Sequence, residues 1–164
     1  FQPSATLRSR GGQLEAWDTA TVAQALERGL VPIVHGDVAF DAAQGSAIIS
    51  TEQLLEALGR EPALRPGRVV LVGEAGVYTA DPRSNPAAER IPRISAQNID
   101  AVLRGAGGSH GADVTGGMRS KVELMWRLVQ TLPGLQVQLI GPEPGLLAAA
   151  LLGNAPDAGT IIAE

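Results

Sequence analysis

The chain has 164 residues, of which 45% are hydrophobic and 18% are charged, and its net charge is −4 at pH 7. This composition is typical of a globular domain and argues against disorder. The negative charge offers no footprint for nucleic acid or an anionic membrane, and the longest apolar runs are far shorter than the roughly 18 residues that cross a bilayer. The absence of cysteine excludes disulfides and thiolate metal sites and is compatible with a cytoplasmic location.

The first part of the chain predicts helices and strands in alternation. The expected elements are a helix at 20–28 that ends at Gly29, a strand at 31–35, a loop at Gly36-Asp37, a strand at 48–49 and a helix from 51 to 59. The last of these begins with Ser50-Thr51-Glu52-Gln53, which matches a capping box. In that motif Ser50 bonds the backbone of Gln53, whose side chain reaches back to the backbone of Ser50.

The second part continues the alternation. The expected elements are a buried strand at 68–72, a long loop that carries Tyr78, a helix at 95–104, a glycine-rich loop, a helix from 118 onward, a half-exposed strand at 135–139, a helix at 144–153 and a strand at 159–162. Such alternation predicts an α/β protein, a three-layer sandwich around a mostly parallel sheet. Ligands collect beyond the carboxyl ends of parallel strands, and the loops at Gly36, Thr51, Gly73 and Gly116 fall near strand ends or helix starts.

Lys121 is the only lysine in a chain whose other basic residues are arginine, and it follows the glycine pair Gly116-Gly117 at a helix start. The beginning of a helix attracts phosphate. A compact ammonium group suits a phosphoryl group that moves between oxygens better than a planar guanidinium does. A solvated surface lysine is the alternative. The segment is not a Walker-type loop, because no glycine directly precedes Lys121 and no Ser or Thr follows it.

Four residues that often bind metals do not predict a metal site here. His35 and His110 lack metal-ligand spacing, and His35 at a strand end is expected to be structural. Asp37 and Asp41 lie on one loop, where acidic residues are more often solvated or capping groups. We therefore predict no metal site built by the protein.

Five short segments occur in the order in which the amino-acid-kinase family has them. They are 31–38, 48–50, 76–82, 113–121 and 159–161. In these segments the chain resembles that family, and within it the isopentenyl phosphate kinases, in which a strand ending in Gly-Asp-Val precedes an Ile-Ser-Gly-Asp turn. The resemblance covers nearly all of this chain but only the latter part of a family member. It implies an incomplete amino-acid-kinase-like fold, in which residues 1–164 are a single domain, the C-terminal nucleotide-binding portion.

The resemblance implies transfer of the ATP γ-phosphate to isopentenyl phosphate, which yields isopentenyl diphosphate for isoprenoid biosynthesis. The implied cofactors are ATP and Mg²⁺, the substrate is a small-molecule phosphate, and the assembly is a homodimer in the cytoplasm. Fosfomycin, uridylate and carbamate kinases share the fold and remain open, because the missing section largely chooses the acceptor. A noncatalytic nucleotide-binding module is a further alternative.

The resemblance also implies roles for nucleotide-side residues. Lys121 contacts the transferred phosphoryl group, and Gly117 lies against the nucleotide phosphates, where a side chain would keep the backbone away. Tyr78 and Asp81 stand at nucleotide-contacting positions. Gly73 belongs to the same predicted set, although Val72-Gly73-Glu74-Ala75 replaces the Thr-Asp-Val-Asp of relatives. The hydroxyl and carboxylate that would meet the nucleotide are therefore gone.

On the acceptor side, Thr51 stands at a substrate contact at a helix start, and Gly36 and Asp37 complete the predicted substrate-binding set. Glu52 falls where the family has an aspartate that orients the catalytic lysines, although helix-start electrostatics explains a glutamate there equally well. The family's N-terminal section, with its first lysine and its glycine-rich phosphate loop, is absent. We therefore expect this stretch alone to be catalytically inactive.

Overall fold

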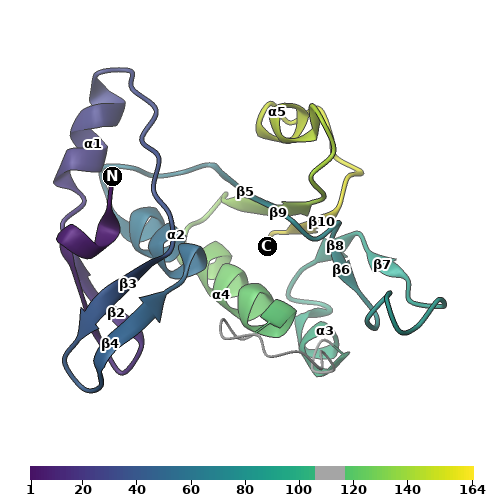
Figure 1. Cartoon of the computed structure of the whole chain (residues 1–164). Coiled ribbons are helices and arrows are strands. Elements are labelled where there is room, and N and C mark those ends of the chain that lie inside the picture. Colours follow the sequence, from purple (N-terminus) through teal and green to yellow (C-terminus); the bar gives the residue numbers. More distant parts are fainter. Residues whose placement is uncertain (106–116) are drawn as a thin grey trace. The chain divides into compact units, whose positions relative to one another are not determined.

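The computed structural model describes residues 1–105 and 117–164, so the predicted glycine-rich loop with His110 and Gly116 lies outside the described residues. The chain forms two compact units, unit 1 (Phe1–Arg65) and unit 2 (Pro66–Glu164), and each is described by itself (Figure 1). The single domain expected over residues 1–164 stays a prediction. Among the described helices, none is long and apolar enough to cross a membrane.

Unit 1 is built on a four-stranded sheet in the order β2-β1-β3-β4. The pairs β1–β2 and β3–β4 are antiparallel hairpins, and β1 pairs with β3 in parallel. The elements in chain order are the 3-10 helix η1 (Pro3–Ala5), β1 (Leu7–Arg10), β2 (Gln13–Trp17), α1 (Ala20–Glu27), β3 (Asp37–Asp41), β4 (Gly45–Ile49) and α2 (Thr51–Arg60). One hydrophobic core cluster of this unit consists of Leu7, Ala39, Ile49 and Leu54, with Leu14 and Trp17 packed against it.

Asp41, at the end of β3, joins the two hairpin turns of unit 1. Its carboxylate accepts hydrogen bonds at 2.9–3.1 Å from five groups, the amides of Gly11, Gly12, Ala43 and Gln44 and the hydroxyl of Ser9. Burial opposes ionisation, but the hydrogen bonds outweigh it and hold the pKa of Asp41 well below its ordinary value. Asp41 therefore acts as a capping group, as the sequence predicts.

The capping box of α2 is confirmed in one half only. The hydroxyl of Ser50 accepts a hydrogen bond from the Gln53 amide at 3.2 Å. The prediction that the Gln53 side chain bonds back to the Ser50 backbone is wrong, because that side chain reaches the β1–β2 hairpin instead. Its amide bonds the Gly12 carbonyl at 3.2 Å and its oxygen accepts from the Leu14 amide at 3.1 Å. Gln53 therefore fixes the helix to the sheet.

The strand predicted at 31–35 is wrong. These residues form no strand, and β3 begins later, at Asp37, inside the expected loop. The physical reason is that no strand among the described residues pairs with this segment. Without a neighbour its apolar side chains stay in solvent, and Val31 and Ile33 are 86% and 75% exposed.

Unit 2 contains a four-stranded sheet in the order β5-β9-β10-β8 and a separate two-stranded sheet, β6–β7. The pairs β5–β9 and β8–β10 are parallel, whereas β9–β10 and β6–β7 are antiparallel. The elements are β5 (Arg68–Val72), β6 (Val77–Tyr78), β7 (Arg90–Ile91), β8 (Arg93–Ile94), α3 (Ile99–Gly105), α4 (Gly117–Thr131), β9 (Gln136–Ile140), α5 (Leu146–Leu151) and β10 (Thr160–Ile162).

Two helices cover the larger sheet of unit 2. α4 packs on β9 and β10, and α5 packs on β5 and β9. Figure 1 shows the two helices on opposite faces of that sheet. The buried face of α4 includes Val122, Met125 and Val129, as their helical spacing predicts. The predicted α/β class is therefore confirmed, and unit 2 has three layers around a mixed sheet.

The strand β9 differs from its prediction. The alternation of apolar residues with glutamine predicts a half-exposed strand, but Gln138 is 1% exposed. Its side-chain amide donates to the carbonyls of Ala155 and Ala158 at 2.7 and 2.8 Å. A buried amide is stable when its donors are satisfied. The loop before β10 supplies those acceptors, and a pattern of residue types cannot show that.

Candidate functional site

The predicted site residues fall into two groups, one in each unit. Unit 1 holds the acceptor-side residues Gly36, Asp37, Thr51 and Glu52. Unit 2 holds the nucleotide-side residues Gly73, Tyr78, Asp81, Gly117 and Lys121. Each group is built from different elements of its unit, and the roles of all nine residues stay predictions.

In unit 1 the structure brings Gly36 and Thr51 together at the start of α2. The Gly36 amide donates to the Thr51 hydroxyl at 3.2 Å. A Cβ atom at Gly36 would lie 3.1 Å from the Ile49 carbonyl oxygen and 3.2 Å from the Thr51 nitrogen, so the backbone approach leaves little room for a side chain. The first amides of an α-helix have no intrahelical partner and favour an anion. This place therefore suits one end of a phosphate-bearing acceptor.

Asp37 contributes differently from its neighbours. Its carboxylate accepts hydrogen bonds from the amides of Ser4 at 3.2 Å and Val38 at 2.9 Å. Hydrogen bonding to Ser4 is the largest influence and lowers the pKa of Asp37 below its ordinary value. Asp37 is thus an ionised group that ties the start of the chain to β3, and its contact with substrate stays a prediction.

In unit 2 three of the predicted nucleotide-side residues, Gly73, Tyr78 and Asp81, lie on the segment that leaves β5. Gly73 follows β5, and its amide donates to the Ile140 carbonyl at 2.9 Å. Tyr78 is the second residue of β6 and pairs with Arg90 of β7. Asp81 is exposed in the turn beyond the hairpin strand, and its carboxylate accepts from the Arg83 amide at 2.9 Å. Asp81 therefore caps its own turn, and its side chain has a structural use besides any nucleotide contact.

The start of α4 brings a glycine and a lysine close together. Gly117 is buried and has a φ of +69° as the first residue of this helix of 15 residues. Lys121 lies four residues on, on the same face of the helix. Arg119, on the intervening turn, is paired with Glu123 at 3.0 Å. The residues present fit a nucleotide phosphate here, because a helix start, a glycine and a lysine meet within one turn.

Magnesium is a different case. Within residues 1–105 and 117–164, no group of three or more His, Asp or Glu could hold a metal ion. Protein-bound Mg²⁺ usually takes one or two carboxylates together with substrate phosphates. The described residues therefore do not form a complete magnesium site, and we assign no step to that ion.

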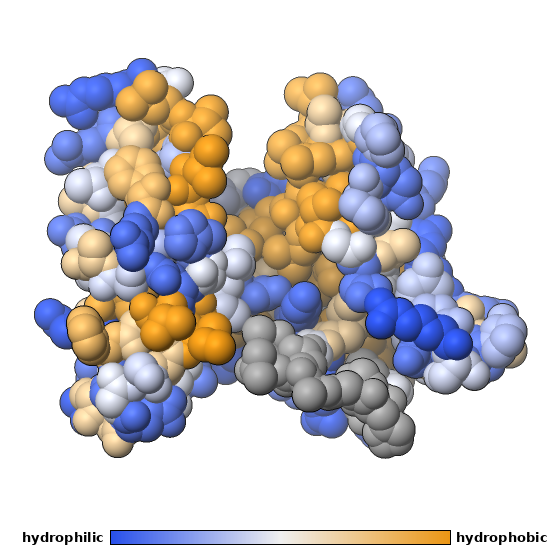
Figure 2. Space-filling model, in the orientation of Figure 1, coloured by the Kyte–Doolittle hydropathy of each residue, from blue (hydrophilic) through white to orange (hydrophobic). Residues whose placement is uncertain are grey.

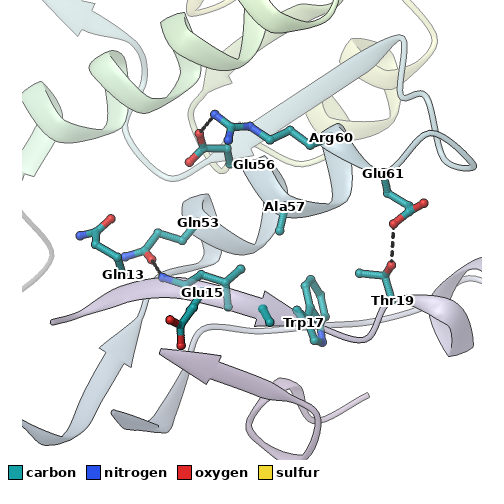
Figure 3. Close-up of a pocket in the computed structure, with 11 residues that line it drawn as sticks. Gln13, Glu15, Trp17, Thr19, Gln53, Glu56, Ala57, Arg60 and Glu61 are labelled. Carbon is teal, nitrogen blue, oxygen red and sulfur yellow. Dashed lines mark hydrogen bonds and ion pairs between the residues drawn. The ribbon is translucent and has the colours of Figure 1, made fainter. Parts of the chain in front are cut away.

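A hollow of about 230 Å³ in unit 1 is not a phosphate site. It lies between β2 and α2, and Figure 3 shows Arg60 turned toward Glu56 and Glu61 turned toward Thr19. Arg60 pairs with Glu56 at 2.5 Å, and Thr19 donates to Glu61 at 3.1 Å. With Glu15 also in the lining, acidic groups outnumber the one arginine. The excess of carboxylates would repel an anion.

Sequence reasoning missed one polar contact near the nucleotide-side residues. The Thr160 hydroxyl at the start of β10 accepts from the Val77 amide and donates to the Ile91 carbonyl, both at 2.7 Å. The segment Gly159-Thr160-Ile161 carried the family resemblance, but nothing in the sequence alone assigned its hydroxyl a partner 83 residues away.

Comparisons with known proteins place this geometry in context. Residues 2–139 match the amino acid kinase family. An isopentenyl phosphate kinase of Methanothermobacter thermautotrophicus is 34% identical over 158 residues, which cover 94% of this chain and 57% of that protein. A glutamate 5-kinase of Yersinia pestis is 37% identical over 152 residues, which cover 92% of this chain and 39% of that protein. An X-ray structure of isopentenyl phosphate kinase superposes with a TM-score of 0.73 at 28% identity, over 99% of this chain and 57% of that one.

Proposed function

Because this chain belongs to the amino acid kinase family, we propose that it forms the nucleotide-side and part of the acceptor-side machinery of a kinase that phosphorylates isopentenyl phosphate with ATP. The predicted amino-acid-kinase fold is confirmed, and the family is one of phosphotransferases. The chain spans 57% of the isopentenyl phosphate kinase that it resembles. The activity proposed is accordingly that of the whole protein, and we propose that this chain forms its C-terminal portion.

An apolar surface beside Gly36 and Thr51, at the start of α2, carries the proposal. Val38 and Ile48 are direct partners across β3–β4 and are 58% and 54% exposed. They stand one register position from the Asp37–Ile49 pair, next to Gly36 and Thr51. Phe40, 88% exposed, extends the same face, and Figure 2 shows hydrophobic surface over this hairpin. An acceptor with a phosphate at one end and a five-carbon apolar chain at the other needs this combination.

The chemistry follows from bringing two anions together. An oxygen of the acceptor phosphate forms a bond to the γ-phosphorus of ATP, the bond from that phosphorus to the β,γ-bridging oxygen breaks, and ADP leaves. Such transfer depends on positioning and on neutralising charge in the transition state. In the proposed site the start of α4 holds phosphate oxygens, and Lys121 follows the charge as it moves from donor to acceptor.

Glutamate phosphorylation is the second candidate. It is favoured by the 37% identity to a glutamate 5-kinase. That acceptor is a polar amino acid whose carboxylate takes the phosphoryl group, so it would leave Val38 and Ile48 against a charged ligand. Transfer of apolar surface from water to an apolar environment is favourable, and a charged ligand would not supply that environment. The exposed pair therefore favours the isopentenyl chain.

Binding to the 164-residue chain separates these candidates without requiring turnover. We expect isopentenyl phosphate to bind at least about tenfold more tightly than methyl phosphate in calorimetric titration, because each buried methylene contributes about 0.8 kcal/mol. Val38→Ser should remove most of that difference, whereas Leu152→Ser, a matched change at an exposed apolar residue of unit 2, should preserve it. Equal affinity for the two phosphates, or tighter binding of glutamate, would contradict the proposal.

A further inference from the structure

The hairpin β6–β7 is too small to hold itself in place. Each strand has two residues, and within the described residues the two strands pair with each other and with no further strand. An isolated two-stranded hairpin is marginally stable in water. The hairpin nevertheless carries Tyr78 and leads into the turn of Asp81. A surface that receives a nucleotide needs a defined position, so something outside the hairpin must supply it.

The hydroxyl of Thr160 supplies a contact to both strands at once. Thr160 is fully buried, and its Oγ1 accepts from the Val77 amide of β6 and donates to the Ile91 carbonyl of β7. Both donor and acceptor functions of the hydroxyl are thus used, each at 2.7 Å. Val77 is itself 1% exposed, so its amide has no access to water if the hydroxyl is removed.

The residues around Thr160 are shaped to this contact. Gly76, directly before β6, has a φ of +139°, and a Cβ there would lie 2.9 Å from Thr160 Oγ1. Arg90 of β7 donates from its guanidinium to the carbonyl of Gly159. β10 itself is fixed on both sides by β8 and β9. Thr160 therefore belongs to the four-stranded sheet of unit 2, and it contacts the backbone of the hairpin β6–β7.

We propose that Thr160 is a positioning residue that holds hairpin β6–β7 on the sheet and so presents Tyr78 to the nucleotide in a preformed place. The inference rests on the proposed function for the identity of the ligand, but the contact between Thr160 and the hairpin is independent of it. Preorganisation of this kind lowers the ordering cost of binding. Its loss should weaken nucleotide affinity without requiring any lost contact between Thr160 and the ligand.

The test uses the 164-residue chain, in which Tyr78 is the only tyrosine. Incorporation of 3-fluorotyrosine gives a single fluorine resonance that reports on the hairpin. Thr160→Val removes both hydrogen bonds at nearly constant shape, and Thr160→Ser keeps the hydroxyl. Thr19→Val is the matched control, because Thr19 is a buried threonine of unit 1 whose hydroxyl bonds Glu61. Hydrogen exchange at the Val77 amide is measured in parallel.

We expect Thr160→Val to speed exchange at Val77 about tenfold or more and to shift the tyrosine resonance, because two net hydrogen bonds are lost. Its affinity for a nonhydrolysable ATP analogue should fall by a similar factor. Thr160→Ser and Thr19→Val should resemble wild type in all three measurements. Unchanged exchange and an unchanged resonance in a folded Thr160→Val variant would overturn the proposal.

Two further outcomes distinguish the anchoring of the hairpin by Thr160 from the nucleotide contact at Tyr78. If Thr160→Val does not fold, wild-type exchange still decides, because the proposal requires the Val77 amide to be as protected as the amides of β9 and an unprotected Val77 would overturn it. If the ATP analogue fails to move the tyrosine resonance of wild type, the nucleotide contact at Tyr78 fails. The exchange data then still establish or refute the anchoring of the hairpin by Thr160.

Discussion

Substitution of Gly117 by alanine tests whether the start of α4 receives a phosphate. Gly117 has a φ of +69°, and Gly134, shortly after the same helix, has a φ of +84°. A left-handed conformation costs an L-residue about 1–2 kcal/mol, so alanine at either position should lower the free energy of unfolding by about that amount. A Cβ at Gly134 meets no atom within 4 Å, which makes Gly134→Ala a control that carries the backbone strain alone.

The two variants should differ in nucleotide binding. A lost charge-assisted hydrogen bond to phosphate costs about 1.5–3 kcal/mol, so Gly117→Ala should weaken ATP binding about tenfold to a hundredfold, and the bulkier Gly117→Val should weaken it further. Gly134→Ala should bind ATP as wild type does. Stability is followed by urea unfolding through Trp126 of α4 in a Trp17→Phe background, and affinity by calorimetry. Unchanged ATP affinity in folded Gly117 variants would refute the reasoning and leave Gly117 as an ordinary helix-entry glycine.

Two further predictions concern stability and completeness. The lowered pKa of Asp41 means that its ionised form contributes stability above its ordinary pKa, and that this contribution is lost as the pH falls through its folded value. Asp41→Asn should therefore be less stable than wild type at neutral pH and show a flatter decline below about pH 4 in thermal unfolding; parallel curves would contradict this. The chain of residues 1–164 alone should not catalyse phosphoryl transfer and should self-associate through exposed apolar side chains such as Val72 of β5 and Val31. A monomer in light scattering that turns over isopentenyl phosphate would contradict this prediction.

Much of the fold could be predicted because local signals agreed with the tertiary structure. The helical spacing on α4 indicated burial, and those residues are buried as expected. The valine-rich run of β5 correctly indicated a strand, but not its full burial, because only Val69 is buried and Val72 is 48% exposed. The β1–β2 hairpin was missed although it had a signal. Gly11-Gly12 has positive φ at both positions, as a two-residue hairpin turn requires. A search for paired glycines between alternating residues would have found it.

Other features depend on partners that a sequence pattern cannot show. The segment at 31–35 reads as a strand, yet a strand forms only beside another strand, and none among the described residues pairs with it. Gln53 was assigned to its own helix cap, but it bonds the hairpin of unit 1 instead. In the candidate site, Gly36 and Thr51 were predicted separately, and their direct hydrogen bond came from the fold. The anchoring hydroxyl of Thr160 had no sequence signal beyond a short motif.

Phosphoryl transfer by the full-length protein, compared between wild type and Lys121→Ala, tests the central claim most directly. With ATP and saturating isopentenyl phosphate, wild type should form isopentenyl diphosphate, and Lys121→Ala should be at least about a hundredfold slower, since it loses charge neutralisation in the transition state. Arg127→Ala, an exposed basic residue further along α4, should retain wild-type turnover, and all three proteins should unfold at similar urea concentrations. Equal turnover by wild type and Lys121→Ala, or transfer to glutamate in place of isopentenyl phosphate, would contradict the account.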